Sequence, residues 1–271
     1  SSSSNIIKMN NWTWDYFSAF EYPIVATILQ SAYANKTVEF KNLTIKHSST
    51  SNLCNKPSNG LDIPDIDVSG WSLPIEIYDL RNAFSTLSRV NYINCDDWII
   101  KNNNSLLVDN MFSKCHQLKN VSINNWKHSR KDNTFIESAT SMFKDCYNLN
   151  NITLIDWTFS SYNKLSNMFY STCGTSVRIS FINCTFAGSS TYKFVDTLGL
   201  GCSFYSSNSI LDLSSSTFNA YNGYERMFAN TNFETINLSN TTFNTSSPIN
   251  LRYMFADNYN LKNVITSNIH I

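Results

Sequence analysis

The chain has 271 residues and a formal net charge of zero, and only 15% of its residues are charged. Such a chain lacks the basic footprint that neutralises phosphates, which argues against nucleic-acid binding. No apolar run approaches the ~20 residues of a membrane-spanning helix, and the 7 glycines form no phosphate-binding loop.

Residues 1–33 do not follow the pattern of the rest of the chain. The segment begins with several aromatic residues and becomes helix-like from Pro23, since proline suits the first turn of a helix. We predict an N-terminal helical cap over the first turn of a repeat domain. The alternative is a docking segment, in which Trp12, Trp14 and Phe17 anchor the domain to a larger assembly.

A repeat of 26 to 31 residues occupies most of the remaining chain. Each copy is centred on a Met-Phe pair or a degenerate form of it. An apolar residue precedes the pair by four positions, and an apolar-x-apolar pair and a Trp position follow it. The copies align at Ala83-Phe84, Met111-Phe112, Met142-Phe143, Met168-Phe169, Thr197-Leu198, Met227-Phe228 and Met254-Phe255.

One unit of this length cannot bury its own apolar face, so the copies are expected to stack as a solenoid over residues 34–271. The apolar-x-apolar pair predicts a short parallel strand in each turn. The apolar spacing around Met-Phe predicts a short helical or 3₁₀ segment on the opposite wall. The fold class is therefore a leucine-rich-repeat-like β-solenoid of about nine turns.

The two most regular copies are MFSKCHQLKNVSINNW at 111–126 and MFKDCYNLNNITLIDW at 142–157. This pattern resembles the repeat of BspA-like bacterial surface proteins, which are leucine-rich-repeat-like chains of bacteria, mollicutes and some parasitic protists. The resemblance covers residues 77–266 well and residues 34–76 weakly, and the Asp-Thr-Ser that follows Trp in that family is degraded here. The resemblance implies surface exposure and adhesion or partner binding rather than catalysis.

The cysteines repeat with the unit. Cys115, Cys146, Cys173 and Cys202 share one position, and Cys95 and Cys184 fall on core positions. We predict reduced, buried thiols; the alternative is a disulfide between neighbouring turns, such as Cys115 with Cys146. There is no CxxC motif and no histidine pair with ligand spacing, so we predict neither a metal site nor a cofactor.

The outward residue of each predicted strand is polar, and together these residues are expected to form one continuous face. Extended solenoid faces of this kind bind proteins or glycans. No pair of carboxylates recurs in a pattern suited to acid–base catalysis, and we predict that the chain is not an enzyme. The candidate ligand-binding residues are Thr44, Asp67, Asn94, Ser122, Thr153, Ser180, Asp212 and Asn237.

The sequence therefore predicts an extracellular or cell-surface module that binds a protein or a surface glycan through a solenoid face. The alternative is a structural component of a virion or cell-surface assembly, such as a fibre, decoration or attachment protein at the virion surface. The sequence shows no capping element after the last predicted strand, so self-association or an assembly partner is expected at this end.

Overall fold

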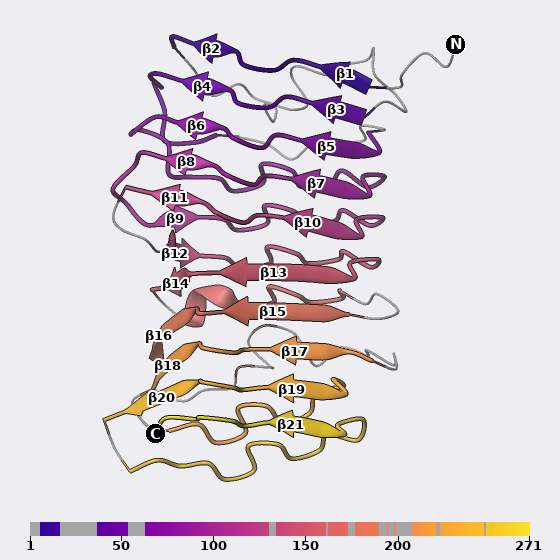
Figure 1. The fold of residues 1–271 in the computed structure, drawn as a ribbon, viewed down its shortest axis with the longest axis vertical. Coiled ribbons are helices and arrows are strands. Elements are labelled where there is room, and N and C mark those ends of the chain that lie inside the picture. The colour runs from indigo at the N-terminus through magenta and orange to yellow at the C-terminus, as the bar shows by residue number, and fades with distance from the viewer. Residues whose placement is uncertain are drawn as a thin grey trace.

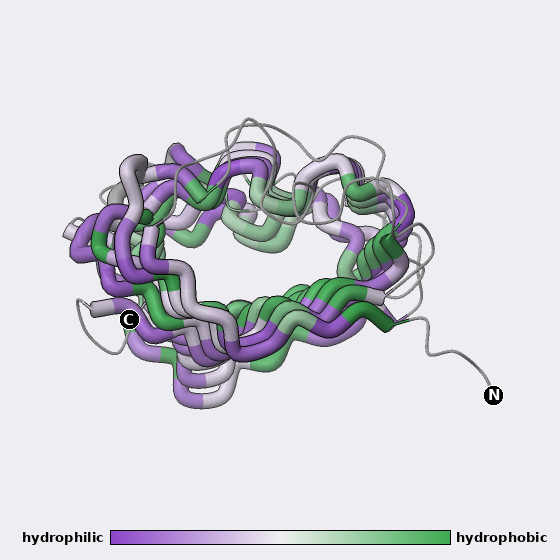
Figure 2. The backbone as a smooth tube through the Cα atoms, turned by 90° about the horizontal axis from the view of Figure 1, so that it is seen from above, coloured by the Kyte–Doolittle hydropathy of each residue, from purple (hydrophilic) through white to green (hydrophobic). Residues whose placement is uncertain are grey.

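A computed structural model of the chain describes residues 6–16, 37–53, 63–129, 134–160, 162–172, 177–189, 208–220, 223–246 and 248–271, together with Phe194 and Leu198. Over these residues the chain winds into a parallel β-solenoid whose turns stack along one axis (Figure 1). Seen along that axis, the turns superimpose on one oval outline (Figure 2). The predicted solenoid architecture is thus confirmed.

The longest sheet, here called the front sheet, runs the length of the stack with ten parallel strands. Equivalent residues face each other from strand to strand, as Ile66, Ile93 and Val121 do, and all three are buried. In spatial order the strands are β1 (Ile6–Lys8), β3 (Thr37–Glu39), β5 (Asp65–Asp67), β7 (Tyr92–Asn94), β10 (Asn120–Ser122), β13 (Asn151–Ile155), β15 (Arg178–Ile182), β17 (Ile210–Asp212), β19 (Thr235–Asn237) and β21 (Asn263–Ile265).

A second wall follows the corner after each front strand, and it consists of two sheets. The N-terminal side sheet has five strands, in the order β11 (Lys127–His128), β8 (Ile99–Ile100), β6 (Ser72–Leu73), β4 (Thr44–Ile45) and β2 (Thr13–Trp14). The C-terminal side sheet has six strands, in the order β20 (Thr242–Thr245), β18 (Thr217–Ala220), β16 (Thr185–Ser189), β14 (Trp157–Phe159), β12 (Thr134–Ser138) and β9 (Leu106–Leu107).

The back wall carries the Met-Phe pairs, and the prediction of short helical or 3₁₀ segments on this wall holds only in part. A 3₁₀ helix, η1 (Tyr162–Leu165), precedes Met168, and the described residues Phe194 and Leu198 are helical. In the other turns, such as that of Phe84, the wall consists of successive turns: Ala83 N–H donates to Leu80 O at 3.3 Å, and Asn82 and Thr86 have positive φ values of 61° and 63°. A run of L-residues with repeated positive φ cannot form a right-handed helix, although its apolar spacing imitates one.

Hydrogen bonds between turns hold the back wall together as strand ladders hold a sheet. The N–H groups of Leu80, Asn82 and Phe84 donate to the carbonyls of the next turn at 2.8, 3.1 and 2.9 Å. The same alternation recurs in the turns that contain Met111, Met142 and Met227. Each turn therefore depends on its neighbour for backbone hydrogen bonds on this wall as well as on the front sheet.

The interior is one continuous core in which like side chains stack. The indoles of Trp71 and Trp98 lie 5.4 Å apart at an interplanar angle of 4°, and those of Trp98 and Trp126 lie 5.2 Å apart at 3°. Phe112 and Phe143 form a parallel stack on the back wall at 5.3 Å. Such pairs contribute roughly 0.5–1.5 kcal/mol each beyond the area that they bury.

The Trp position of the repeat also supplies a buried hydrogen-bond donor. The indole N–H of Trp98 donates to Val68 O at 2.7 Å, so it satisfies a carbonyl at the end of the preceding front strand. Where Trp is replaced, a smaller donor makes the same bond. Ser216 Oγ donates to Phe181 O at 2.8 Å, and Thr241 Oγ1 donates to Leu213 O at 3.2 Å. The Trp position of the repeat thus requires a side-chain hydrogen-bond donor as well as a side chain that fills the core.

The cysteine position of the repeat also supplies a buried hydrogen-bond donor, at the opposite corner of the turn. The thiols of Cys115 and Cys146 each donate to a phenylalanine carbonyl of the preceding turn at 3.1 Å. Thr172 Oγ1 donates to Phe143 O at 2.7 Å, and Asn258 Nδ2 donates to Phe228 O at 2.7 Å. Cysteine, threonine and asparagine are interchangeable here because each carries a donor at a similar reach from the backbone.

The stack begins earlier than residue 34. The strands β1 and β2 pair in parallel with β3 and β4, so residues 6–14 already form the walls of a turn. The predicted cap covers residues 1–33, and its helical part from Pro23 onward lies outside the described residues. The count of about nine turns is not confirmed, because parts of several turns, such as residues 54–62, lie outside the described residues.

Replacing Ser216 tests the donor at the Trp position. Ser216→Ala leaves the buried carbonyl of Phe181 and the N–H of Cys184 without their partner, and we expect it to lower the free energy of unfolding by about 1–3 kcal/mol. Ser216→Cys keeps a donor, as Cys184 does in the preceding turn, and should lose less. Urea unfolding followed by circular dichroism makes the comparison, and equal losses for the two variants would contradict it.

Candidate functional site

The outer surface of the front sheet carries two parallel rows of side chains. The trailing row contains the third residue of each three-residue strand and the equivalent residue of the longer strands, and it holds most of the predicted ligand-binding residues. Its members are Lys8, Glu39, Asp67, Asn94, Ser122, Thr153, Ser180, Asp212, Asn237 and Ile265. Of the eight residues that were predicted to form one face, seven lie in this row.

Thr44 is the exception, because its predicted position on the same face as the other seven residues is wrong. It lies in β4 of the N-terminal side sheet, where it pairs with Thr13 and Ser72. Glu39 occupies the front-sheet position in that turn and pairs with Asp67. The unit contains two apolar-x-apolar pairs, Val38-x-Phe40 and Leu43-x-Ile45, and only the first pair belongs to the front sheet.

Side chains of the trailing row cap the corner that follows each front strand. The side-chain oxygen of the row residue accepts the backbone N–H two residues later, as in an Asx turn. This bond measures 3.1 Å from Ser69 N to Asp67, and 3.0 Å from both Asp96 N to Asn94 and Ser239 N to Asn237. These atoms therefore have a structural role, which reduces their availability to a ligand.

Two members of the row are buried, although their register places them on the outer face of the sheet. Ser180 is 1% exposed and Asp212 is 5% exposed. The carboxylate of Asp212 accepts from Asn237 Nδ2 at 3.0 Å and from Arg178 Nη2 at 3.2 Å. Arg178 thus lies across the carboxylate and is itself the exposed group at this point of the face.

Asp67 illustrates the electrostatics of the row. Burial alone would raise the pKa of this carboxyl, but hydrogen bonds from Lys41 and Ser69 outweigh that effect, and its pKa is lowered. The Lys41 ammonium lies 2.9 Å from the carboxylate, and the pKa of Lys41 is raised chiefly by this hydrogen bond. Both groups stay charged at neutral pH and form a fixed ion pair rather than a titrating one.

The second row of the face was missed by the sequence reasoning. This leading row contains the residue before each buried central position, and several of its side chains are exposed, namely Tyr92, Asn120, Asn151, Arg178 and Asn263. The signal was present in the sequence, because both neighbours of an inward strand residue must point outward. The outer face is therefore two residues wide.

The N-terminal aromatic residues belong to the first described turn. Trp12 and Trp14 both pack on Phe40, with ring centroids 5.8 Å away in each case. Trp14 is partly buried against the core, whereas Trp12 is 49% exposed. Phe17 lies outside the described residues. Their assignment as docking residues stays a prediction.

The four cysteines in the described part, Cys95, Cys115, Cys146 and Cys184, are free and buried, which agrees with the prediction of reduced thiols. Burial raises the pKa of Cys115 and Cys184 to about 12 and raises that of Cys95 and Cys146 well above the ordinary value. The described residues contain no group of three His, Cys, Asp or Glu side chains that could hold a metal ion. Cys54, Cys173 and Cys202 lie outside the described residues.

None of the residues that the structure describes builds a helix with the length and apolarity needed to cross a bilayer.

The raised thiol pKa values predict unreactive cysteines in the folded protein. The thiolate is the nucleophile, and burial keeps these groups protonated well above the ordinary thiol pKa of about 8.5. Near that pH, iodoacetamide should leave Cys95, Cys115, Cys146 and Cys184 unmodified and should label them in concentrated guanidinium chloride. Peptide mass spectrometry reads each site separately, and stoichiometric labelling of Cys115 in the folded protein would refute the expectation.

Comparison with known proteins finds one family. The model of a family described as "Mycoplasma protein of unknown function, DUF285" matches residues 67–197. Searches of the curated proteins and of the solved structures find no match to the chain. The family match and the solenoid together support a Mycoplasma-type repeat domain. They are compatible with the BspA-like resemblance, which stays a prediction.

Proposed function

We propose that the chain is a non-enzymatic interaction and adhesion module that is exposed at a cell surface and binds a protein or glycan partner through the outer face of the front sheet. The observation that carries this proposal is the ten-stranded parallel sheet, which presents two rows of mainly polar side chains along the whole stack. A long, regular face suits a partner that makes many weak contacts rather than one deep one.

The leading row supplies the more accessible groups of this face. Asn120, Asn151 and Arg178 occupy successive exposed positions in β10, β13 and β15. Side-chain amides both donate and accept hydrogen bonds, and a guanidinium donates them while being more weakly hydrated than an ammonium. Exposed Tyr92 adds an aromatic surface at the neighbouring position, and aromatic and arginine side chains are enriched where binding energy concentrates.

The family match does not indicate what the chain binds or where it is located, since the family is described as a Mycoplasma protein of unknown function. Extracellular or cell-surface exposure therefore rests on the resemblance of the repeat to BspA-like surface proteins.

Substituting the leading row tests the proposed face. The triple variant Asn120→Ala, Asn151→Ala, Arg178→Lys removes two exposed amides and the guanidinium group but keeps a cation beside the buried Asp212 carboxylate, so the fold should be kept. We expect attachment of protein-coated beads to cultured epithelial cells to fall roughly tenfold, the change that a loss of about 1.4 kcal/mol produces. A triple variant of outward side-wall residues, Thr185→Ala, Thr217→Ala, Thr242→Ala, is the control. Unchanged attachment by the front-sheet variant would rule out this face.

A second candidate function is a structural component of a virion or cell-surface assembly, in which copies of the chain associate end to end. The observation that favours it is the last described strand, β21, whose three residues are all exposed. Val264 is 36% exposed and Ile265 is 44% exposed. Within the described residues β21 pairs with β19 on one side, and an exposed strand edge with apolar side chains is a template for a strand of a second copy.

Sedimentation velocity tests the end-to-end contact. If copies associate through β21, the sedimentation coefficient should rise with protein concentration. Val264→Lys should abolish the rise, because it places a charge in the contact. Thr242→Lys, on the side wall, should leave association intact. A single monomeric species at all concentrations, in both the parent protein and the variants, would reject self-association.

A further inference from the structure

The side wall of the solenoid has one break in its pairing. Side strands usually pair with the equivalent strand of the next turn, as β4, β6, β8 and β11 do. The N-terminal side sheet ends at β11, and the next turn does not continue it, because β14 pairs with β12 and β16 instead. Both β11 and β12 belong to one turn, as β8 and β9 belong to the turn before it. The next turn continues only the ladder of β12, through β14.

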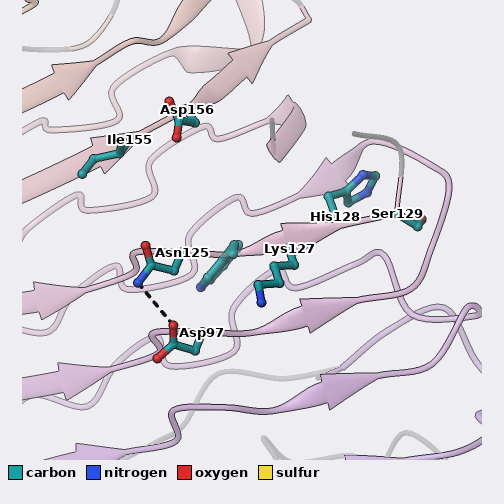
Figure 3. A pocket seen from close by; sticks show the side chains of 8 residues that line it. Asp97, Asn125, Lys127, His128, Ser129, Ile155 and Asp156 are labelled. Atoms are coloured by element: carbon teal, nitrogen blue, oxygen red, sulfur yellow. Dashed lines mark hydrogen bonds between the residues drawn. The ribbon is translucent and has the colours of Figure 1, made fainter. Parts of the chain in front are cut away.

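A recess opens beside this break (Figure 3). Its volume is about 680 Å³, which lies within the ~300–1,000 Å³ of typical small-molecule sites. Side chains from three successive turns line it, and Lys127 lies between Asp97 on one side and Ile155 and Asp156 on the other. The lining residues are Asp97, Asn125, Trp126, Lys127, His128, Ser129, Ile155 and Asp156.

The carboxylates of the recess have spare acceptor capacity. Asp97 accepts from Asn125 Nδ2 at 3.2 Å, and Asp156 accepts from Asn183 Nδ2 at 2.6 Å. A carboxylate offers about four lone-pair directions, so each can accept further hydrogen bonds from a ligand. Hydroxyl groups are the donors that such carboxylates hold most directly, through short charge-assisted bonds.

Lys127 adds a positively charged ammonium group that donates hydrogen bonds. Its side chain is exposed and makes no ion pair in the part of the chain that the structure describes. An ammonium group donates up to three hydrogen bonds to hydroxyl oxygens. With two carboxylates against one ammonium, the acidic and basic side chains of the lining carry a formal charge of minus one, which disfavours a phosphate or another anion.

The recess also has an apolar side. Ile155 is 39% exposed at the end of β13 and supplies apolar surface beside the two carboxylates. Trp126, which is 6% exposed, also belongs to the lining. A ligand that meets these groups needs one apolar face and a rim of hydroxyls, and a pyranose ring has both.

We propose that this recess binds a neutral saccharide unit of a surface glycan. The hydroxyls of the sugar donate to Asp97 and Asp156 and accept from Lys127, while one C–H face of the ring packs on Ile155. This inference rests on the proposed function as an interaction module, and it assigns the glycan to the side wall rather than to the front sheet.

Binding of defined oligosaccharides tests the site with the full chain. The probes are neutral galactose-, mannose- and N-acetylglucosamine-terminated oligosaccharides, with a sialylated and a phosphorylated oligosaccharide as charged comparisons. Isothermal titration calorimetry at millimolar probe concentrations measures affinity. We expect at least one neutral probe to bind, and Asp156→Asn, Asp97→Asn and Lys127→Gln each to weaken it roughly tenfold, the cost of one charge-assisted hydrogen bond.

Ile155→Lys provides a variant that is independent of the corner hydrogen bonds, because it fills the recess from an exposed position and should abolish binding without unfolding the chain. Lys119→Gln and Asp257→Asn, at exposed positions elsewhere, are the matched controls and should bind as the parent does. Absence of binding by every neutral probe, binding of the charged probes alone, or binding that survives Ile155→Lys would each overturn the site.

The outcomes separate this inference from the proposed function. If the front-sheet triple variant loses cell attachment while no neutral oligosaccharide binds, the recess fails and the adhesion proposal stands. If an oligosaccharide binds in the recess while the parent protein does not attach to cells, the adhesion proposal fails and the recess stands.

Discussion

The structure depends on hydrogen bonds that each turn makes with the carbonyls of the turn before it at the corners. Parallel strands satisfy the backbone only where they run side by side, and the corners between walls leave carbonyls inside the core. The indole of Trp98 and the thiol of Cys115 each reach back by one turn to such a carbonyl. An unpaired buried carbonyl costs about 1–3 kcal/mol, so every turn needs a donor at both positions.

This constraint explains why the repeat tolerates such different residues at fixed positions. Trp98, Cys184 and Ser216 differ greatly in volume, yet all donate to the same carbonyl position of the preceding turn. The core adjusts to the volume: an indole ladder fills the N-terminal turns, and phenylalanine stacks such as Phe186 on Phe218, at 4.8 Å, fill the later ones. Hydrogen bonding sets the register, and packing then accommodates the side chains.

The sequence was sufficient for the architecture because stacking repeats the same residues at the same interval. It was insufficient for local conformation. The apolar spacing around Met111 imitates a helix, but positive φ at Asn110 and Lys114 and hydrogen bonds to the next turn form successive turns instead. Thr44 was misplaced because one unit contains two apolar-x-apolar pairs. The first turn was not predicted because it lacks the Met-Phe pair. Its residues nevertheless follow the spacing of the next turn, with Ile7, Met9 and Trp12 equivalent to Val38, Phe40 and Leu43.

The candidate face could be predicted only in part, since alternation shows which residues point outward but not which are already engaged. Asn94 and Asn237 use their oxygens to close corners, so a regular polar row is partly a structural element. The recess beside β11 has the opposite origin. It arises where two successive turns each contribute two side strands and the following turn continues only the ladder of β9 and β12. In a regular stack, the equivalent residue of the next turn packs on each side chain and bonds to its polar atoms. Where the repeat is interrupted that neighbour is missing, so different side chains can meet and keep hydrogen-bonding capacity for a ligand.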